Sequence, residues 1–386
     1  MTITSAGAPG GLDDAAPPAE RSPAGTRQPT VVRRAVFLVP AGLAMLAGLD
    51  AALMLLGLPA PVTAQRLPGV HGMVLLLGFV GTLVSLERAV ALRRRPALVA
   101  PALLGAGGLL LVSRAPLVVG RAALLLGAGA MVAVYLPLWR RQRDDAVLVQ
   151  AFGAVLAVGA ALMWLGNLSV PRLLPWLVGF VVLTIAGERL ELARVAMGRT
   201  AGRDLLLLAT GLVTGIVAAL LWPEVGTPLL GLALLALVGW LAAHDVARRT
   251  VRTAGLRRLM AACLLAGYFW LAVAGGTWLL GGPAYDGVRY DAVVHAVFLG
   301  FTVSLIIAHA PVILPAVLHR PLPYHPALWL PVALLHVSLA LRLWVGDALA
   351  VHTAWRVGGL LNIAALLLFV AVAVWSAARR TVGTPA

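Results

Sequence analysis

The stretch "HGMVLLLGFVGTLVSLER", residues 71–88, is an almost uninterrupted apolar run with ionisable residues at both ends. Its length nearly suffices to cross a hydrocarbon core of about 30 Å as a helix. In lipid the backbone must satisfy its own hydrogen bonds, so such a run is helical. The whole chain follows this pattern, since 61% of its residues are hydrophobic, 12% are charged and its mean hydropathy is +0.95. The composition predicts an all-α polytopic membrane bundle.

Counting such runs outward from this one gives twelve membrane-spanning helices. They are expected near residues 35–58, 67–90, 96–113, 116–138, 146–168, 173–196, 204–222, 226–246, 257–281, 290–316, 326–345 and 352–377. The chain is therefore divided into a disordered cytoplasmic tail (1–34), a transmembrane domain (35–378) and a short cytoplasmic tail (379–386).

The basic residues are arginines, and they cluster in alternate connections at 93–95, 140–143, 194–203 and 248–258. The positive-inside rule places these connections and both termini in the cytoplasm of a cell bounded by a plasma or inner membrane. The net charge of +15 therefore reflects membrane topology, and no nucleic-acid partner is expected.

A Gly-Phe pair occurs in three of these runs, at Gly78, Gly179 and Gly300, which are 101 and 121 residues apart. A polar residue follows each glycine by nine positions: Glu87, Glu188 and His309. The copies fall on the second, sixth and tenth spans, each the second of four. This predicts a threefold pseudo-repeat of four helices around a common axis.

His71 and His295 lie near the predicted outer ends of the second and tenth spans. Imidazoles at matched height on two helices can hold one haem iron from both faces, so this pair is the candidate haem site. The alternative is a pair of interfacial histidines bonded to backbone or lipid. At about 100° per residue from the repeat glycine, the two histidines would occupy faces about 160° apart.

His309 and His336 are the other candidate metal-ligating residues. Ionisable groups within a membrane are costly and are functional candidates by default, although a histidine bonded to a neighbouring helix would satisfy the same observation. Cys263 is the single cysteine, which excludes a multi-cysteine metal site.

Glu87, Glu188, Glu191 and Arg189 are the other polar candidates, at the inner ends of the second and sixth spans. One interpretation is that each arginine extends to the interface and pairs with its neighbouring glutamate. The other is a proton relay or a polar pocket shared with His309.

The twelve helices, the threefold arrangement and the histidines of spans 2 and 10 resemble the catalytic subunit of haem–copper oxidases and nitric oxide reductases. The segment "HGMVLLLGF" is also similar to the NnrS family of haem- and copper-containing proteins of nitric oxide metabolism. The resemblance implies that His71 and His295 are axial haem ligands. Span 7 has no histidine pair, so a full oxidase binuclear centre is not expected.

These observations favour a protein of the lipid bilayer that binds haem or copper. It would serve electron transfer to or from a redox partner protein, or nitrogen-oxide or metal handling. A secondary transporter with an intramembrane Glu/His coupling site is the alternative, and an assembly factor without a cofactor is the third. No motif of hydrolytic or nucleotide chemistry is present, and whether the protein is an enzyme is left open.

Overall fold

The computed structural model describes residues 36–318 and 322–378. The two predicted tails, 1–34 and 379–386, lie outside the described residues. Within the described residues there are twelve helical spans long and apolar enough to cross a membrane, which confirms the polytopic all-α prediction.

The first six spans run from the start of the described chain to residue 197. Their helical elements are α2 (Leu38–Leu55), α3 (Leu67–Met73), η1 (Val74–Gly81), α4 (Thr82–Leu92), η2 (Arg95–Leu98) with α5 (Val99–Val112), α6 (Leu117–Gln142), α7 (Asp145–Leu165) and α8 (Val170–Met197). The second span is continuous through α3, η1 and α4, and η2 with α5 forms the third.

The remaining six spans continue along the chain. They comprise α9 (Ala201–Leu221), α10 (Pro223–His244), α12 (Gly255–Gly281), then α13 (Gly287–His295), η3 (Ala296–Val303) and α14 (Ser304–Leu318), then η4 (Pro326–Leu328), α15 (Trp329–Ala340) and η5 (Leu341–Ala348), and finally α16 (His352–Ala378). The short helix α11 (Ala247–Thr250) lies in a connection.

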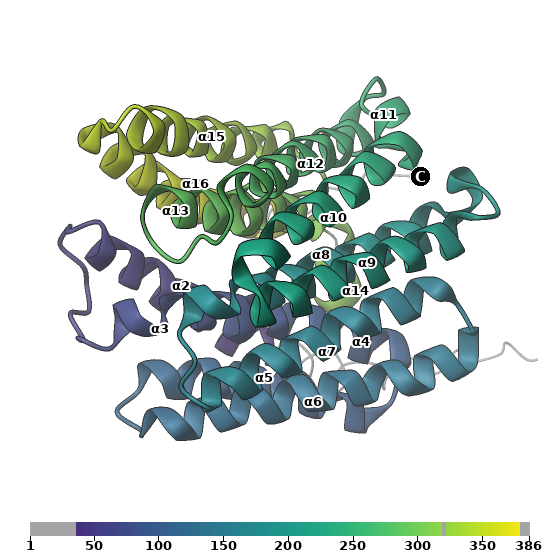
Figure 1. The fold of residues 1–386 in the computed structure, drawn as a ribbon, viewed down its shortest axis with the longest axis horizontal. Coiled ribbons are helices and arrows are strands. Elements are labelled where there is room, and N and C mark those ends of the chain that lie inside the picture. Colours follow the sequence, from purple (N-terminus) through teal and green to yellow (C-terminus); the bar gives the residue numbers. More distant parts are fainter. Residues whose placement is uncertain (1–35, 319–321, 379–386) are drawn as a thin grey trace, which may run out of the picture.

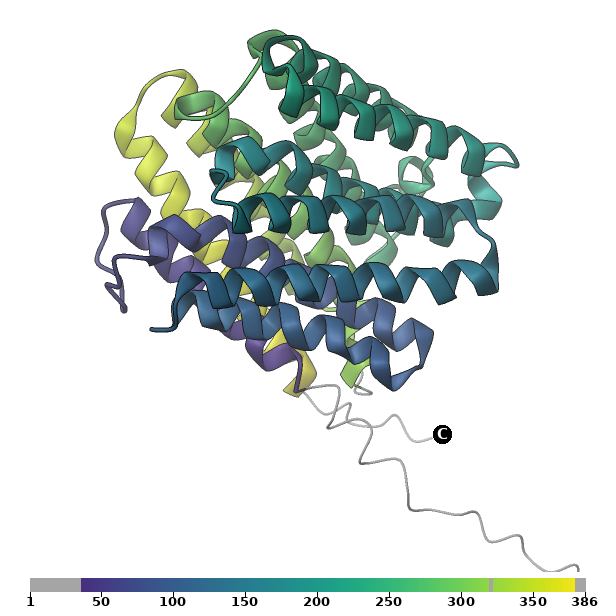
Figure 2. The same ribbon diagram turned by 60° about the horizontal axis from the view of Figure 1, so that its bottom comes forward.

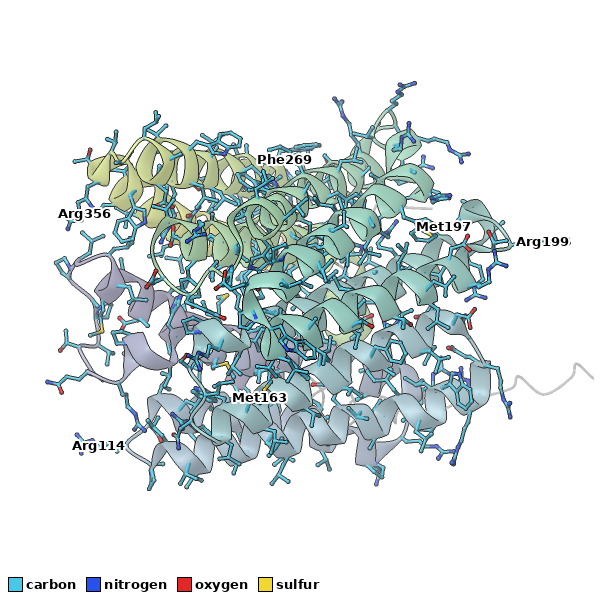
Figure 3. The ribbon with its side chains drawn as sticks, viewed as in Figure 1. Arg114, Met163, Met197, Arg199, Phe269 and Arg356 are labelled. Carbon is cyan, nitrogen blue, oxygen red and sulfur yellow. The ribbon has the colours of Figure 1, made fainter. Side chains whose placement is uncertain are left out.

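The spans run roughly side by side, and the connections gather at two opposite ends (Figure 1). Arg199 lies at the end that also carries α11, whereas Arg114 and Arg356 lie at the other end (Figure 3). We call the first the inner end and the second the outer end, following the predicted orientation. Among the described helices the last, α16, packs against the first, α2 (Figure 2).

The three spans with the Gly-Phe pair are the most buried of the twelve described. In their most apolar windows 61%, 67% and 61% of the residues are buried, whereas no other described span exceeds 56%. Each packs against the span before it and the span after it: η1 contacts α2 and α5, α8 contacts α7 and α9, and η3 contacts α12 and α15. The three spans that carry the Gly-Phe pair therefore share high burial and packing on both sequence neighbours, and the threefold arrangement around an axis stays a prediction.

The repeat glycines lie where their spans pack closely against a neighbouring span. A Cβ at Gly78 would lie 2.9 Å from the backbone Cα of Gly108 in α5, and a Cβ at Gly300 would overlap the ring of Trp270 in α12. Close helix packing in membranes depends on such small residues, so the motif is explained first by packing.

Two of the three central spans contain π-helical turns. They are η1, which follows His71 by three residues, and η3, which begins directly after His295. The third central span, α8, is α-helical throughout. π-Helical turns are rare and often occur at functional sites. They also change the angle between each histidine and its glycine, so the 100° per residue used to place the histidines on opposite faces does not hold.

Candidate functional site

His71 and His295 line one cavity between the second and tenth spans, near the outer end. We call it the outer cavity; its volume is about 120 Å³. Apolar side chains from α2, η1, α8, η3 and α16 form most of its wall. The polar residues of the wall are His71, Tyr290, His295, Thr302, Arg342 and Asn362. The structure therefore brings together the two histidines that the sequence singled out.

Both imidazoles are anchored in the same way. Nδ1 of His71 lies 2.9 Å from the carbonyl oxygen of Gly48, and Nδ1 of His295 lies 2.9 Å from that of Asp291. A carbonyl only accepts hydrogen bonds, so each Nδ1 must carry the proton. In a neutral imidazole the Nε2 lone pair then remains available to a ligand. Among the described residues neither Nε2 has a hydrogen-bond partner.

The carboxylate of Asp291 contacts His295, and Arg342 in turn binds that carboxylate. Oδ1 of Asp291 lies 3.2 Å from Nδ1 of His295, one helical turn along the same helix. Arg342, from η5, donates to both oxygens of Asp291 at 2.7 Å each, and its guanidinium lies 4.9 Å from the ring centre of Trp355. Metal-ligating histidines commonly donate their second N–H to a carboxylate or a carbonyl, and His295 has both.

Asn362 contributes an unsatisfied polar atom to the same wall. Its Nδ2 donates to Oγ of Ser338 at 2.6 Å, but its buried Oδ1 has no hydrogen-bond partner among the described residues. Leaving a buried acceptor unpaired costs about 1–3 kcal/mol. A ligand or a water that donates a hydrogen bond in the outer cavity would remove this cost.

A second cavity of about 450 Å³ lies toward the inner end, and we call it the inner cavity. It shares Phe79, Val80 and Thr302 with the outer cavity. Its ionisable wall residues are Glu87, Glu188, Arg189 and His309. Glu87, Glu188 and His309 are the ninth residues of the three repeat copies, so the repeat places all three on one cavity.

The glutamates are held by Arg88, a residue that the sequence analysis did not select. Arg88 is 8% exposed, and its guanidinium lies 2.7 Å from Glu87, 3.1 Å from Glu191 and 3.5 Å from Glu188. Gln150 of α7 also accepts from it at 3.1 Å. The pairing of Arg88 with its neighbour Glu87 agrees with the first interpretation given above, whereas the contact with Gln150 in the apolar run 145–165 was not predicted.

Arg189 does not extend to the interface or pair with Glu188, contrary to the first interpretation given above. It is 6% exposed and donates to both oxygens of Asp245, at 2.9 and 3.0 Å. The hydroxyl of Tyr268 donates to the same carboxylate at 2.7 Å. Burial opposes ionisation of Asp245, but the Arg189 hydrogen bonds and charge outweigh it and hold the pKa of Asp245 below its usual value.

His336 is fully engaged in a structural network. Nε1 of Trp270 donates to Nδ1 of His336 at 3.0 Å, and Nε2 lies 3.2 Å from Oγ of Ser304. Ser304 in turn donates to the carbonyl of Cys263. Because Nδ1 accepts, Nε2 carries the proton, and no lone pair is left for a metal.

The predicted copper site is therefore not supported. His309 lines the inner cavity, with its Nδ1 bound to the carbonyl of Leu305 at 2.9 Å. Within the described part of the chain, no group of three or more His, Cys, Asp or Glu side chains is arranged to hold a metal ion. His309 stays a candidate for the inner cavity, and His336 is withdrawn as a metal ligand.

Comparison with known proteins gives one family. A family described as a domain of unknown function (DUF8744) matches residues 34–378, which is nearly the whole chain. No curated protein and no solved structure matches the chain.

Proposed function

The chain belongs to the DUF8744 family, whose description assigns no function. From the residues of the outer cavity we propose that the protein is an integral membrane protein that binds haem through His71 and His295. The observation that carries the proposal is that both histidines line one largely apolar cavity, each with its Nδ1 within hydrogen-bond distance of a backbone carbonyl, which leaves Nε2 for a ligand. Haem bound between two neutral imidazoles supplies one-electron chemistry, so the role we propose is electron transfer with a redox partner protein.

The donor set of the cavity suits haem. Asp291 contacts the Nδ1 side of His295, Arg342 is paired with Asp291, and the remaining wall is largely apolar. At about 120 Å³ the cavity is smaller than the roughly 300–1,000 Å³ of typical small-molecule sites. A macrocycle must therefore displace apolar side chains such as Phe298, or occupy space that continues past Phe79 toward the inner cavity.

The resemblance to the NnrS family extends this proposal to nitrogen-oxide handling. A haem held there would supply the redox chemistry that such handling requires. His71 is bonded to a single carbonyl, whereas His295 also contacts Asp291, so His295 is the more firmly positioned of the two histidines.

The experiment is an absorption and metal analysis of protein purified in detergent after expression with added haem. A Soret band that is present in the wild type, lost in His71→Ala and His295→Ala, and retained in His244→Ala supports the proposal. His244 is the control because it lies exposed at the end of α10, with its Nδ1 on the carbonyl of Trp240. A colourless, metal-free wild type overturns it.

A secondary transporter is the second candidate, and one observation favours it. Glu87, Glu188 and His309 come from different repeat copies and meet on the inner cavity, as a coupling site between helices would require. Proton-coupled flux in liposomes that is lost in Glu188→Gln would support it. Flux equal to that of empty liposomes excludes it, whatever the absorption spectrum.

A further inference from the structure

The inner cavity carries an excess of negative charge next to a large apolar wall. Glu87, Glu188 and Glu191 share a single guanidinium, that of Arg88, so the cluster has a formal charge of −2 when all three are ionised. Glu87 and Glu188 line the inner cavity. Arg88, which neutralises part of this charge, is not among the residues of the cavity wall.

The other cation at the cavity is already neutralised. Arg189 forms a two-bond salt bridge with Asp245, which also accepts from Tyr268. His309 donates its Nδ1 proton to the carbonyl of Leu305 on its own helix. The wall therefore presents two carboxyl groups whose shared cationic partner, Arg88, lies outside the wall.

The charge cluster behind the cavity wall is incompletely hydrogen-bonded within the described chain. Oε1 of Glu188 is ion-paired with Nη2 of Arg88 at 3.5 Å but accepts no hydrogen bond, and the buried Nε of Arg88 donates none. The hydroxyl of Tyr135, a residue that is 2% exposed, is also without a hydrogen-bond partner in the described chain. Buried polar groups are normally paired, so the single guanidinium of Arg88 does not satisfy the whole cluster.

The rest of the cavity suits an apolar body. Its volume of about 450 Å³ lies within the range of small-molecule sites, and side chains of α2, α14 and α16 such as Met45, Ile313 and Phe369 form the wall opposite the glutamates. Leu192 and Val374, which are 69% and 63% exposed, also belong to the wall, so the cavity reaches the surface of the bundle.

We propose that the inner cavity binds a monovalent lipophilic cation, with its charge against Glu87 and Glu188 and its apolar body against α2, α14 and α16. A carboxylate in an apolar, partly dehydrated site attracts such a cation far more strongly than a carboxylate in water. The proposal does not depend on haem in the outer cavity. It also does not require transport, since it concerns binding at equilibrium.

The test uses two probes of nearly equal size and opposite charge, tetraphenylphosphonium and tetraphenylborate. Equilibrium dialysis against the full-length protein in nanodiscs, with empty nanodiscs as the blank, should show saturable binding of the phosphonium at least about tenfold tighter than that of the borate. Equal binding of the two ions, or no saturable phosphonium binding, overturns the proposal.

Two variants test the location. Glu188→Gln keeps the shape and leaves Glu87 and Glu191 to pair with Arg88, and it should weaken phosphonium binding about tenfold. Gly42→Phe fills the cavity from α2, where a Cβ has no neighbour within 4 Å, and should weaken binding without changing any charge. Affinity unchanged in both variants rejects this location.

A control variant that removes one carboxylate elsewhere distinguishes an effect of the proposed site on phosphonium affinity from an effect of the protein's total charge. Glu224→Gln removes one carboxylate at an exposed site on α10 and should leave phosphonium affinity as in the wild type. Loss of binding in this control as well as in Glu188→Gln would show a general charge effect and would also reject the location.

Discussion

Arg342 donates two hydrogen bonds of 2.7 Å each to Asp291 and so connects the eleventh span to the tenth, one helical turn from His295. The two side chains are 9% and 18% exposed, so neither charge is compensated by bulk water. The pair fixes the carboxylate that contacts His295. Its integrity is therefore a condition for the geometry of the outer cavity.

Removing one partner of this pair should destabilise the bundle strongly. Arg342→Met leaves Asp291 without its arginine and with only the His295 contact, and breaking such a pair costs about 3–5 kcal/mol. The double variant Arg342→Met with Asp291→Leu should lose less than the sum of the two single losses. The measurement is a double-mutant cycle from denaturant unfolding in detergent, and additive losses would show that the pair contributes no coupling.

The Arg189–Asp245 pair should make stability depend on pH at acid values. The pKa of Asp245 is lower in the folded protein than in the unfolded chain, so the folded state binds this proton less readily. The stabilisation is therefore complete above the unfolded pKa of about 3.9 and is lost as pH falls through the lower folded value.

The comparison that isolates this effect is wild type against Asp245→Asn. The difference in unfolding free energy should be constant above about pH 5 and shrink as pH falls below about 4. The control is Asp204→Asn, because the carboxylate of Asp204 pairs with the exposed Arg203 at the surface and should add little to stability at any pH. A difference between wild type and Asp245→Asn that persists unchanged to low pH would contradict the assignment.

The membrane spans could be predicted from the sequence because hydropathy depends on each segment alone. The predicted range 352–377 coincides with the final span, and 326–345 ends three residues before Ala348. Features that depend on a segment alone could therefore be predicted.

The long-range partners of the polar residues could not be predicted from the sequence in the same way. Arg88 contacts Gln150 and Glu191, which are 62 and 103 residues away, and His336 accepts from Trp270, which is 66 residues away. A residue spacing carries no information about such contacts. The π-helical turns η1 and η3 were also missed, since "VLLLGFVG" and "AVFLGFTV" look like ordinary apolar helix.

The glycine of the first repeat copy should be intolerant of the smallest substitution. A Cβ at Gly78 would lie 2.9 Å from the backbone of Gly108, which cannot move aside as a side chain can. Gly78→Ala should therefore cost about 1–3 kcal/mol of stability. Gly42→Ala is the matched control, because its Cβ meets no atom within 4 Å and should be neutral or slightly stabilising. Equal apparent melting temperatures for the two variants would show that the spans separate easily at Gly78.

The His336 network should contribute to stability and not to metal content. His336→Leu leaves the indole N–H of Trp270 and the hydroxyl of Ser304 without this partner, at a cost of about 1–3 kcal/mol. The measurement is unfolding in detergent together with metal analysis of the purified protein. A loss of bound metal at unchanged stability would restore His336 as a ligand.

The outer cavity can be tested by filling it without touching either histidine. Gly72 lies in its wall next to His71, and an added Cβ would meet only Val170, at 3.8 Å. Gly72→Phe should therefore fold, since its side chain has the cavity to enter, but it should compete with haem for that space. A side chain that weakens haem binding by more than about 1.4 kcal/mol lowers the affinity at least about tenfold. We therefore expect the Soret absorbance per protein to fall at least about tenfold. Gly72→Ala, which adds only the tolerated Cβ, is the control and should keep the band. If Gly72→Phe folds and retains full haem, the cofactor is bound elsewhere in the bundle and the assignment of the outer cavity fails.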